Sequence, residues 1–152
     1  MWSMGIIEVL IISAMPVSEI RGGIPLALYF GLNPIEAYII SFLGNIAPIP
    51  LLLIFLDKFI KIACKISVVD KFYGKIVQHV SKRKRIVEKY GYIGLTMFVA
   101  VPLPVTGAWT GALIAFLLQL NKLKSFIYIT LGVLVSGLIV LLTSLGFLKI
   151  LS

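Results

Sequence analysis

The sequence predicts an all-α integral membrane protein, built as an inverted repeat of two units. Each unit is a re-entrant helical hairpin followed by one transmembrane helix. The composition, the alternation of short and long apolar segments, and an internal repeat predict this class. Hydrophobic residues make up 60% of the 152 residues, well above the roughly 45–50% of soluble domains. The chain is therefore expected to be a multi-pass protein of the cell membrane, with the lipid bilayer as its surroundings.

Short apolar segments alternate with long ones along the chain. The stretch over residues 5–17 reaches only about 20 Å as a helix, less than the roughly 30 Å of a hydrocarbon core. It is followed by a second short stretch, so residues 5–31 are predicted to form a re-entrant hairpin. Residues 34–56 are long enough to span the membrane. The same pattern predicts a second hairpin over 91–118 and a second span over 123–148.

These elements divide the chain into three parts. The first repeat covers residues 1–57, a basic amphipathic segment covers 58–90, and the second repeat covers 91–152. Within the first span, Pro48 and Pro50 are expected to kink the helix, because proline lacks the backbone N–H and clashes with the preceding turn.

The two repeats align without a gap when the sequence is shifted by 88 residues, which places PVSEIRGGIPLALYFGLN over PVTGAWTGALIAFLLQLN. The identities include Pro16 with Pro104, Gly23 with Gly111, and Asn33 with Asn121. A general apolar bias does not readily align proline, glycine and asparagine. One spanning helix separates the hairpins, so they enter from opposite faces, as in transporters with broken helices. The alternative is four ordinary spans, which segments of 10–13 residues disfavour.

Positive charge is concentrated in one segment. Ten of the fourteen lysines and arginines lie in residues 58–90. A basic chain can bind nucleic acid, but a basic loop between apolar blocks is the pattern of the positive-inside rule. The segment is therefore predicted to be cytoplasmic, with both termini outside, and no nucleic-acid partner is expected.

The composition also excludes several kinds of site. Cys64 is the only cysteine and His79 the only histidine, so a Cys- or His-based metal site lacks ligands. No nucleophile–base pair is visible either. We therefore expect no metal, no cofactor and no enzymatic activity.

Glu19 and Arg21 lie in an otherwise apolar stretch. A charge at membrane depth costs about 2.5–3.5 kcal/mol and is functional by default. Arg21 can present a fork of donors to a phosphate or carboxylate, Gly22 and Gly23 allow close backbone approach, and a half-helix starting near Gly22 would aim its amides at the same anion. Glu19 is the candidate coupling residue, binding a proton or sodium. The alternative is a static ion pair between the two halves.

The second hairpin carries polar groups without charge. Thr106, Trp109 and Thr110 are candidates to complete a polar substrate cavity opposite Arg21; alternatively, the hydroxyls bond back to their own helix. Asn45 in the first span either lines this cavity or bridges helices. The residues expected to shape the hairpin tips are Pro16, Pro25, Pro102, Pro104, Gly107 and Gly111.

The strings PVSEIRGGIPLA and VPLPVTGAWTGALIA resemble the small multidrug export protein family over most of the chain. That family resembles a distant branch of the DedA, or VTT (SNARE-associated), superfamily, whose members have two opposed re-entrant hairpins. Those members are linked to lipid scrambling and to recycling of polyprenyl phosphate, with proton coupling. The resemblance implies that Glu19 is the acidic hairpin residue. The chain departs from DedA proteins at Trp109 and Thr110, where arginines are expected.

Three functions follow as hypotheses. The first is a transporter or flippase for an anionic lipid-linked substrate such as polyprenyl phosphate, coupled to protons or sodium. The second is a proton-coupled exporter of lipophilic cations that uses Glu19 as the cation site, although Arg21 repels such cargo. The third is a non-transport membrane subunit. Two full spans enclose a pathway poorly, so a homodimer is expected.

Overall fold

The structure is a computed structural model that describes residues 2–63, 87–103 and 106–151, and all of its regular elements are helices. Pro104 and most of the basic segment 58–90 lie outside the described residues. The helices are α1 (Trp2–Ala14), α2 (Glu19–Tyr29), α3 (Pro34–Ile46), α4 (Ile49–Ala63), a helix over residues 87–100, α6 (Ala108–Leu117) and α7 (Lys122–Leu151). The predicted all-α class is therefore confirmed.

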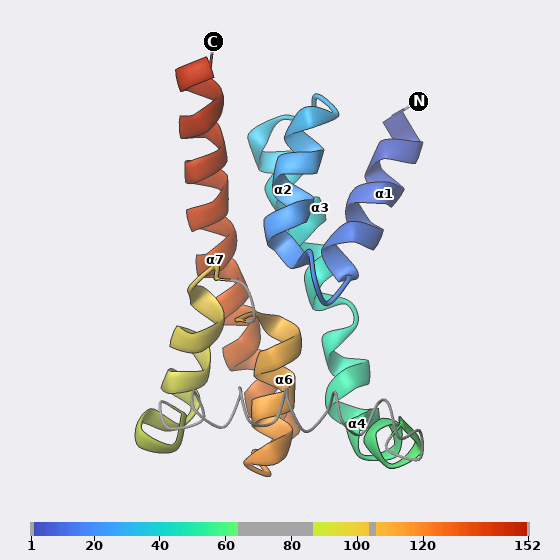
Figure 1. The fold of residues 1–152 in the computed structure, drawn as a ribbon, viewed down its shortest axis with the longest axis vertical. Coiled ribbons are helices and arrows are strands. Elements are labelled where there is room, and N and C mark those ends of the chain that lie inside the picture. The colour runs from blue at the N-terminus through green and yellow to red at the C-terminus, as the bar shows by residue number, and fades with distance from the viewer. Residues whose placement is uncertain (1, 64–86, 104–105, 152) are drawn as a thin grey trace.

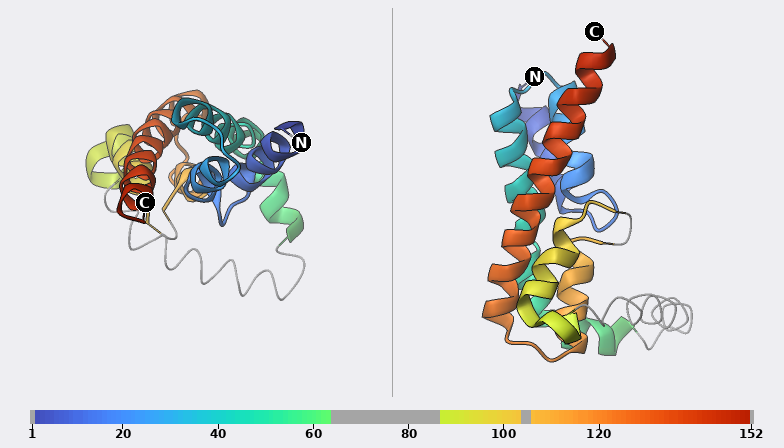
Figure 2. Two further views of the ribbon diagram at one scale, coloured as in Figure 1. Left: turned by 90° about the horizontal axis from the view of Figure 1, so that it is seen from above. Right: turned by 90° about the vertical axis from the view of Figure 1, so that its left-hand side faces the viewer.

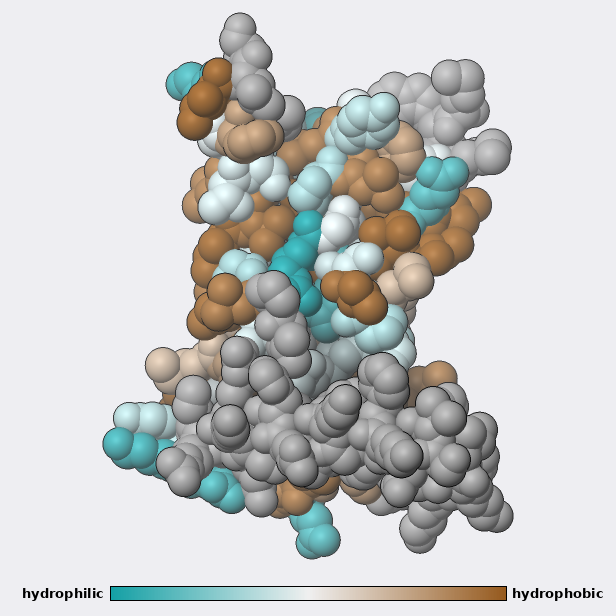
Figure 3. Space-filling model, in the orientation of Figure 1, coloured by the Kyte–Doolittle hydropathy of each residue, from teal (hydrophilic) through white to brown (hydrophobic). Residues whose placement is uncertain are grey.

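Two segments are long and apolar enough to cross a membrane, Pro34–Leu56 and Lys122–Phe147. They match the two spans predicted from the sequence. Large apolar side chains are exposed along both: Ile35, Ile39, Leu43, Leu51 and Ile54 on the first, and Leu123, Ile127, Leu131, Leu138 and Leu142 on the second. Contiguous apolar surface of this kind fits contact with lipid rather than water. Figure 3 shows such side chains over much of the described upper surface of one face, with a narrow hydrophilic strip between them.

The first span is broken near its middle. Helix α3 ends at Ile46, residues 47–48 form a turn, and α4 begins at Ile49. Pro48 and Pro50 have no backbone N–H, so the carbonyls of Gly44 and Ile46 lose their normal helical donors. The expected kink is confirmed. Helix α4 then continues to Ala63, seven residues past the predicted end of the span and into the basic segment.

The short helices occupy opposite halves of the molecule. Helices α1 and α2 are joined by the turn over residues 15–18 and pack against each other and against α3. Helix α6 packs against α4 and α7. Figures 1 and 2 show α2 and α3 beside one half of α7, with α1 farther from it, and α6 with the helix over 87–100 beside the other half. The turn over 15–18 and the described residues of the connection before α6, 101–103 and 106–107, both lie part-way along α7.

The connections that follow α2 and α6 contain the same hydrogen bonds, 88 residues apart. The amides of Phe30 and Leu32 donate to Leu26 and Ala27, and those of Leu118 and Leu120 donate to Ile114 and Ala115. Gly31 and Gln119, also 88 residues apart, both adopt a left-handed backbone, with φ of 81° and 52°. The two connections therefore share one local conformation at the offset found in the sequence.

The helices after these connections also begin alike. The side-chain oxygen of Asn33 accepts the amide of Glu36 at 2.9 Å, and that of Asn121 accepts the amide of Lys124 at 3.1 Å. An asparagine cap satisfies one of the free N–H groups at a helix start. The aligned asparagines thus perform the same task at the start of α3 and of α7.

Candidate functional site

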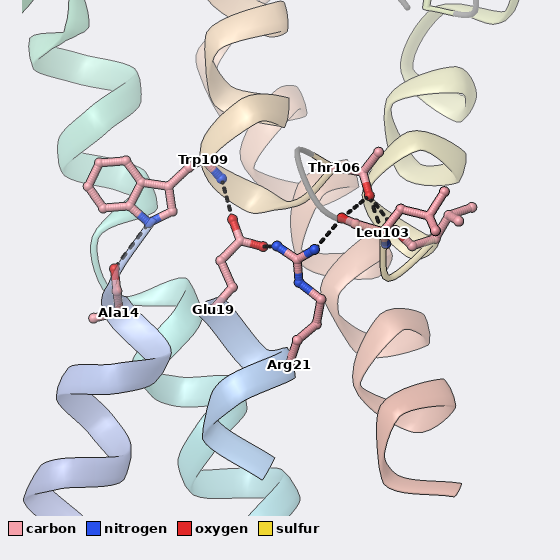
Figure 4. Close-up of polar contacts among 7 residues, drawn as sticks. Ala14, Glu19, Arg21, Leu103, Thr106 and Trp109 are labelled. Atoms are coloured by element: carbon pink, nitrogen blue, oxygen red, sulfur yellow. Dashed lines mark hydrogen bonds and ion pairs between the residues drawn. The ribbon is translucent and has the colours of Figure 1, made fainter. Parts of the chain in front are cut away.

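Glu19 is the first residue of α2 and has a left-handed backbone, with φ of 49°. Such a conformation is uncommon for a residue other than glycine and is strained by roughly 1–3 kcal/mol. The strained residue directs its carboxylate away from α2 and toward the start of α6 (Figure 4). The side chain is buried, with 4% of its surface exposed.

Both oxygens of the Glu19 carboxylate have partners. Oε1 accepts the backbone N–H of Trp109 at 3.3 Å, and Oε2 lies 3.5 Å from Nη2 of Arg21. Trp109 is the second residue of α6, so the carboxylate sits at the positive end of that helix dipole. The acceptor for an amide of the first turn of α6 thus comes from the other half of the molecule.

Gly107, which precedes α6, makes room for this carboxylate. A Cβ at Gly107 would lie 2.5 Å from Cδ of Glu19 and still closer to Oε2. The φ of Gly107 is 162°, which is extended backbone open to any residue. Glycine is therefore required here by the space that Glu19 fills, not by the backbone conformation.

Arg21 joins the two halves a second time. Its Nη1 donates a hydrogen bond to the carbonyl of Leu103, in the connection over 101–107, while Nη2 faces Glu19. The Arg21 side chain keeps 19% of its surface exposed. The guanidinium therefore bridges α2 and the Leu103 carbonyl (Figure 4), and the Arg21 side chain as a whole is partly exposed.

Trp109 and Thr106 complete the polar contacts. The indole Nε1 of Trp109 donates to the carbonyl of Ala14, the last residue of α1, at 3.1 Å. The hydroxyl of Thr106 lies 2.6 Å from the carbonyl of Val101 and accepts the amide of Leu103 at 3.1 Å. Thr106 therefore bonds within the connection that precedes α6 and not to a helix of its own. Thr110, in α6, is half-buried.

The start of α2 differs from the prediction. The helix begins at Glu19, so Gly22 and Gly23 lie inside it and no half-helix starts at Gly22. The helical bonding begins earlier because the amide of Glu19 donates to Met15 and the amide of Gly22 to Ser18. The helix that directs a backbone N–H at a negative charge in this site is α6, whose Trp109 N–H donates to the carboxylate of Glu19.

Two residues predicted at hairpin tips lie elsewhere. Pro25 is inside α2, and Gly111 is inside α6, where a Cβ would meet Val99 at 2.7 Å. Gly111 thus permits close helix packing. Pro16 lies in the turn over residues 15–18, and Pro102 lies in the connection before α6.

The sequence did not identify the backbone carbonyls of Ala14 and Leu103, because any residue type supplies a carbonyl.

A hollow of about 490 Å³ lies away from Glu19 and Arg21, near the end of α6. It is lined by Leu53, Ala115, Phe116, Leu117, Gln119, Leu120 and Lys122. Within the described ranges, no three His, Cys, Asp or Glu side chains gather as a metal site.

Comparison with protein families identifies the family of this chain. The model of a family described as "Putative small multi-drug export protein" matches residues 19–139, which begin at Glu19 and include most of α7. Neither the curated proteins nor the solved structures gave a match.

Proposed function

Because the chain belongs to the small multi-drug export protein family, which implies transport rather than catalysis, we propose that it carries an amphiphilic anion across the membrane. The substrate class is a lipid-linked phosphate such as polyprenyl phosphate, and transport is coupled to protons or sodium. One observation carries the proposal: the guanidinium of Arg21, a partly exposed side chain, contacts both halves and is paired with the buried carboxylate of Glu19.

The proposal includes a re-entrant arrangement. Helices α1 and α6 have 13 and 10 residues and reach about 20 and 15 Å, less than the roughly 30 Å of a hydrocarbon core. The bonds that recur at an offset of 88 residues support an inverted repeat of two hairpin-plus-span units. Under this arrangement, the turn over 15–18 and the connection over 101–107 meet inside the membrane and place Arg21 at depth.

Arg21 has the chemistry to bind a phosphate. A guanidinium has five N–H donors in a planar fork. One donor engages the Leu103 carbonyl and another faces Glu19, which leaves donors for a ligand. Outside the basic segment 58–90, the only other basic residues of the sequence are Lys122, Lys124 and Lys149. They lie in the first and last turns of α7, so among the described side chains outside that segment Arg21 is the only basic group away from the ends of a span.

Glu19 supplies the coupling. While its carboxylate is ionised, it neutralises Arg21 and competes with an incoming anion. A proton on Glu19, or a cation beside it, weakens this competition, so the phosphate and the cation bind together. The substrate then replaces the carboxylate at Arg21, and the contact between Glu19 and α6 opens.

The family description favours a second candidate, export of lipophilic cationic drugs. In that case the Glu19 carboxylate is the cation site. The guanidinium of Arg21 lies 3.5 Å from this carboxylate. It repels a cationic cargo bound to the carboxylate, because two like charges close together are unfavourable in a low dielectric. This electrostatic objection places cation export second.

Reconstitution into liposomes distinguishes the two candidates. The parent protein and Glu19→Gln are compared for transport of a short-chain polyprenyl phosphate and of tetraphenylphosphonium. We expect the phosphate to be transported, with a pH dependence that Glu19→Gln removes because an amide does not exchange a proton. Transport of tetraphenylphosphonium alone, abolished by Glu19→Gln, would contradict the proposal and support cation export.

A further inference from the structure

Three buried polar side chains near Glu19 have oxygen atoms without hydrogen-bond partners. These atoms are Oγ of Ser13 on α1, Oγ of Ser41 on α3, and Oδ1 of Asn45 on α3. All three residues are at least 99% buried. Unpaired buried polar atoms are unfavourable and call for an explanation such as an unseen water or ion.

The Ser13 and Ser41 hydroxyls are close together because Gly23 lets their helices approach, and Gly44, the residue before Asn45, lets α3 approach α1. A Cβ on Gly23 of α2 would lie 2.8 Å from the Ser41 hydroxyl and would overlap the Ser13 hydroxyl. A Cβ on Gly44 of α3 would lie 2.9 Å from Cβ of Ser13. Asn45 is four residues after Ser41, one helical turn along the same face of α3. We call Ser13, Ser41 and Asn45 the oxygen cluster.

Helix packing alone does not require polar residues at this place. In the second half, the glycine equivalent to Gly23 is Gly111, and a Cβ there would meet Val99 at 2.7 Å and Ile129 at 3.5 Å. Ile129 aligns with Ser41, and Val133 aligns with Asn45, at the offset of 88 residues. The same packing position is thus apolar in one half and polar in the other.

The surroundings of the oxygen cluster favour a cation. Ser13 and Asn45 each lie one residue before the last residue of their helix, since α1 ends at Ala14 and α3 at Ile46. Figure 1 shows α1 and α3 running in the same direction. Their C-terminal ends, which carry partial negative charge, therefore lie beside the cluster. The N-terminal end of α2 is also nearby, and Glu19 is the first residue of that helix.

We propose that the oxygen cluster, with the C-terminal ends of α1 and α3, binds a sodium ion. Hard cations prefer hydroxyl and carbonyl oxygens as ligands, and the C-terminal ends of broken helices are a recurrent sodium site in transporters. The cluster surrounds Gly23, which lies one helical turn from Glu19 on α2, a rise of about 5–6 Å.

A coupling role for this ion rests on the proposed function. Glu19 and Arg21 together carry no net charge, so an added phosphate leaves the buried site negative. A sodium ion one turn away offsets part of this negative charge, and each ligand then strengthens the binding of the other by an equal factor. The cation site itself does not depend on this role.

The test uses the full-length protein in detergent micelles without any substrate. Binding of radioactive sodium is measured, and thermal unfolding is compared in sodium chloride and in choline chloride at equal ionic strength. We expect sodium, and not choline, to raise the unfolding temperature of the parent. Ser41→Ala and Asn45→Val are expected to bind sodium about 10- to 100-fold more weakly, as for loss of a partner to a charged group.

Ser125→Ala is the matched control, because Ser125 on α7 is equally buried and its hydroxyl is also unpaired. It should keep the full response to sodium. In choline, Ser41→Ala should be at least as stable as the parent, since it removes an unpaired hydroxyl, so lost binding is distinguishable from misfolding. A parent that unfolds at the same temperature in both salts overturns the proposal, as does an unchanged sodium response in Ser41→Ala.

Failure of the cation site and failure of anion transport give different results. Sodium binding without phosphate binding refutes the proposed function and leaves the oxygen cluster as a cation site. Phosphate binding that does not respond to sodium, in a protein that binds no sodium, overturns the cation site and leaves proton coupling through Glu19.

Discussion

Replacing Gly107 by alanine tests whether the Glu19 carboxylate holds the two halves together. The extended backbone of Gly107 accepts alanine without strain. The added Cβ would lie 2.5 Å from Cδ and Oε1 of Glu19, whereas real Cβ contacts stay beyond 3.0 Å. The carboxylate must therefore move away from the start of α6.

The size of the effect follows from the contacts that this movement breaks. A hydrogen bond to a charged group contributes about 1.5–3 kcal/mol, and here the donor is the amide of Trp109. A charge at a partly buried helix terminus contributes up to about 2 kcal/mol. The two contributions overlap, so we expect Gly107→Ala to lower the free energy of unfolding by about 2–4 kcal/mol.

Unfolding is measured by titrating detergent-solubilised protein with a denaturing detergent. Gly146→Ala, in α7, is the control, because a Cβ there has nothing within 4 Å. That change should be neutral or should stabilise by up to about 1 kcal/mol through helix propensity. In a Glu19→Ala background the loss caused by Gly107→Ala should shrink to about 0.5 kcal/mol or less, because the carboxylate that the Cβ displaces is absent and the two contacting sites are therefore coupled. An undiminished loss in that background would refute the reasoning.

Three further results are expected. Trp109→Phe should lower the free energy of unfolding by about 1 kcal/mol, because the indole hydrogen bond is lost; a stability equal to that of the parent contradicts this. Gly132→Ala should destabilise by about 1–3 kcal/mol, since a Cβ there would lie 2.6 Å from Cβ of Val99; unfolding like that of Gly146→Ala argues against this packing. An impermeant thiol reagent should reach Cys64 only after cells are opened, and labelling in intact cells contradicts a cytoplasmic segment 58–90.

The spans and their break could be predicted from the sequence because local composition determines them. Twenty or more apolar residues form a membrane-length helix in most contexts, and Pro48 and Pro50 remove backbone donors wherever they stand. The pairing of Glu19 with Arg21 was also predictable, since two opposite charges two residues apart in an apolar stretch have few other partners.

The contacts between the halves were not predictable, because they depend on tertiary structure. The partners of Arg21 and Trp109 are the carbonyls of Leu103 and Ala14, which leave no signal in residue type. The start of α2 was misplaced because Glu19 adopts a left-handed backbone that sequence rules assign to glycine. The glycine that matters most for this carboxylate is Gly107, from the other half of the chain.

The measurement that tests the central claim most directly is equilibrium binding of a polyprenyl phosphate to the parent, Arg21→Ala, Arg21→Lys and a control, Lys124→Ala. The control removes the same single charge from an exposed position in the first turn of α7. We expect Arg21→Ala to bind about 10- to 100-fold more weakly, through loss of charged hydrogen bonds. Arg21→Lys should recover part of this loss, because a point charge replaces a fork. Lys124→Ala should bind like the parent. Equal affinity of Arg21→Ala and the parent would contradict the account and leave the ion pair as a structural link between the two halves.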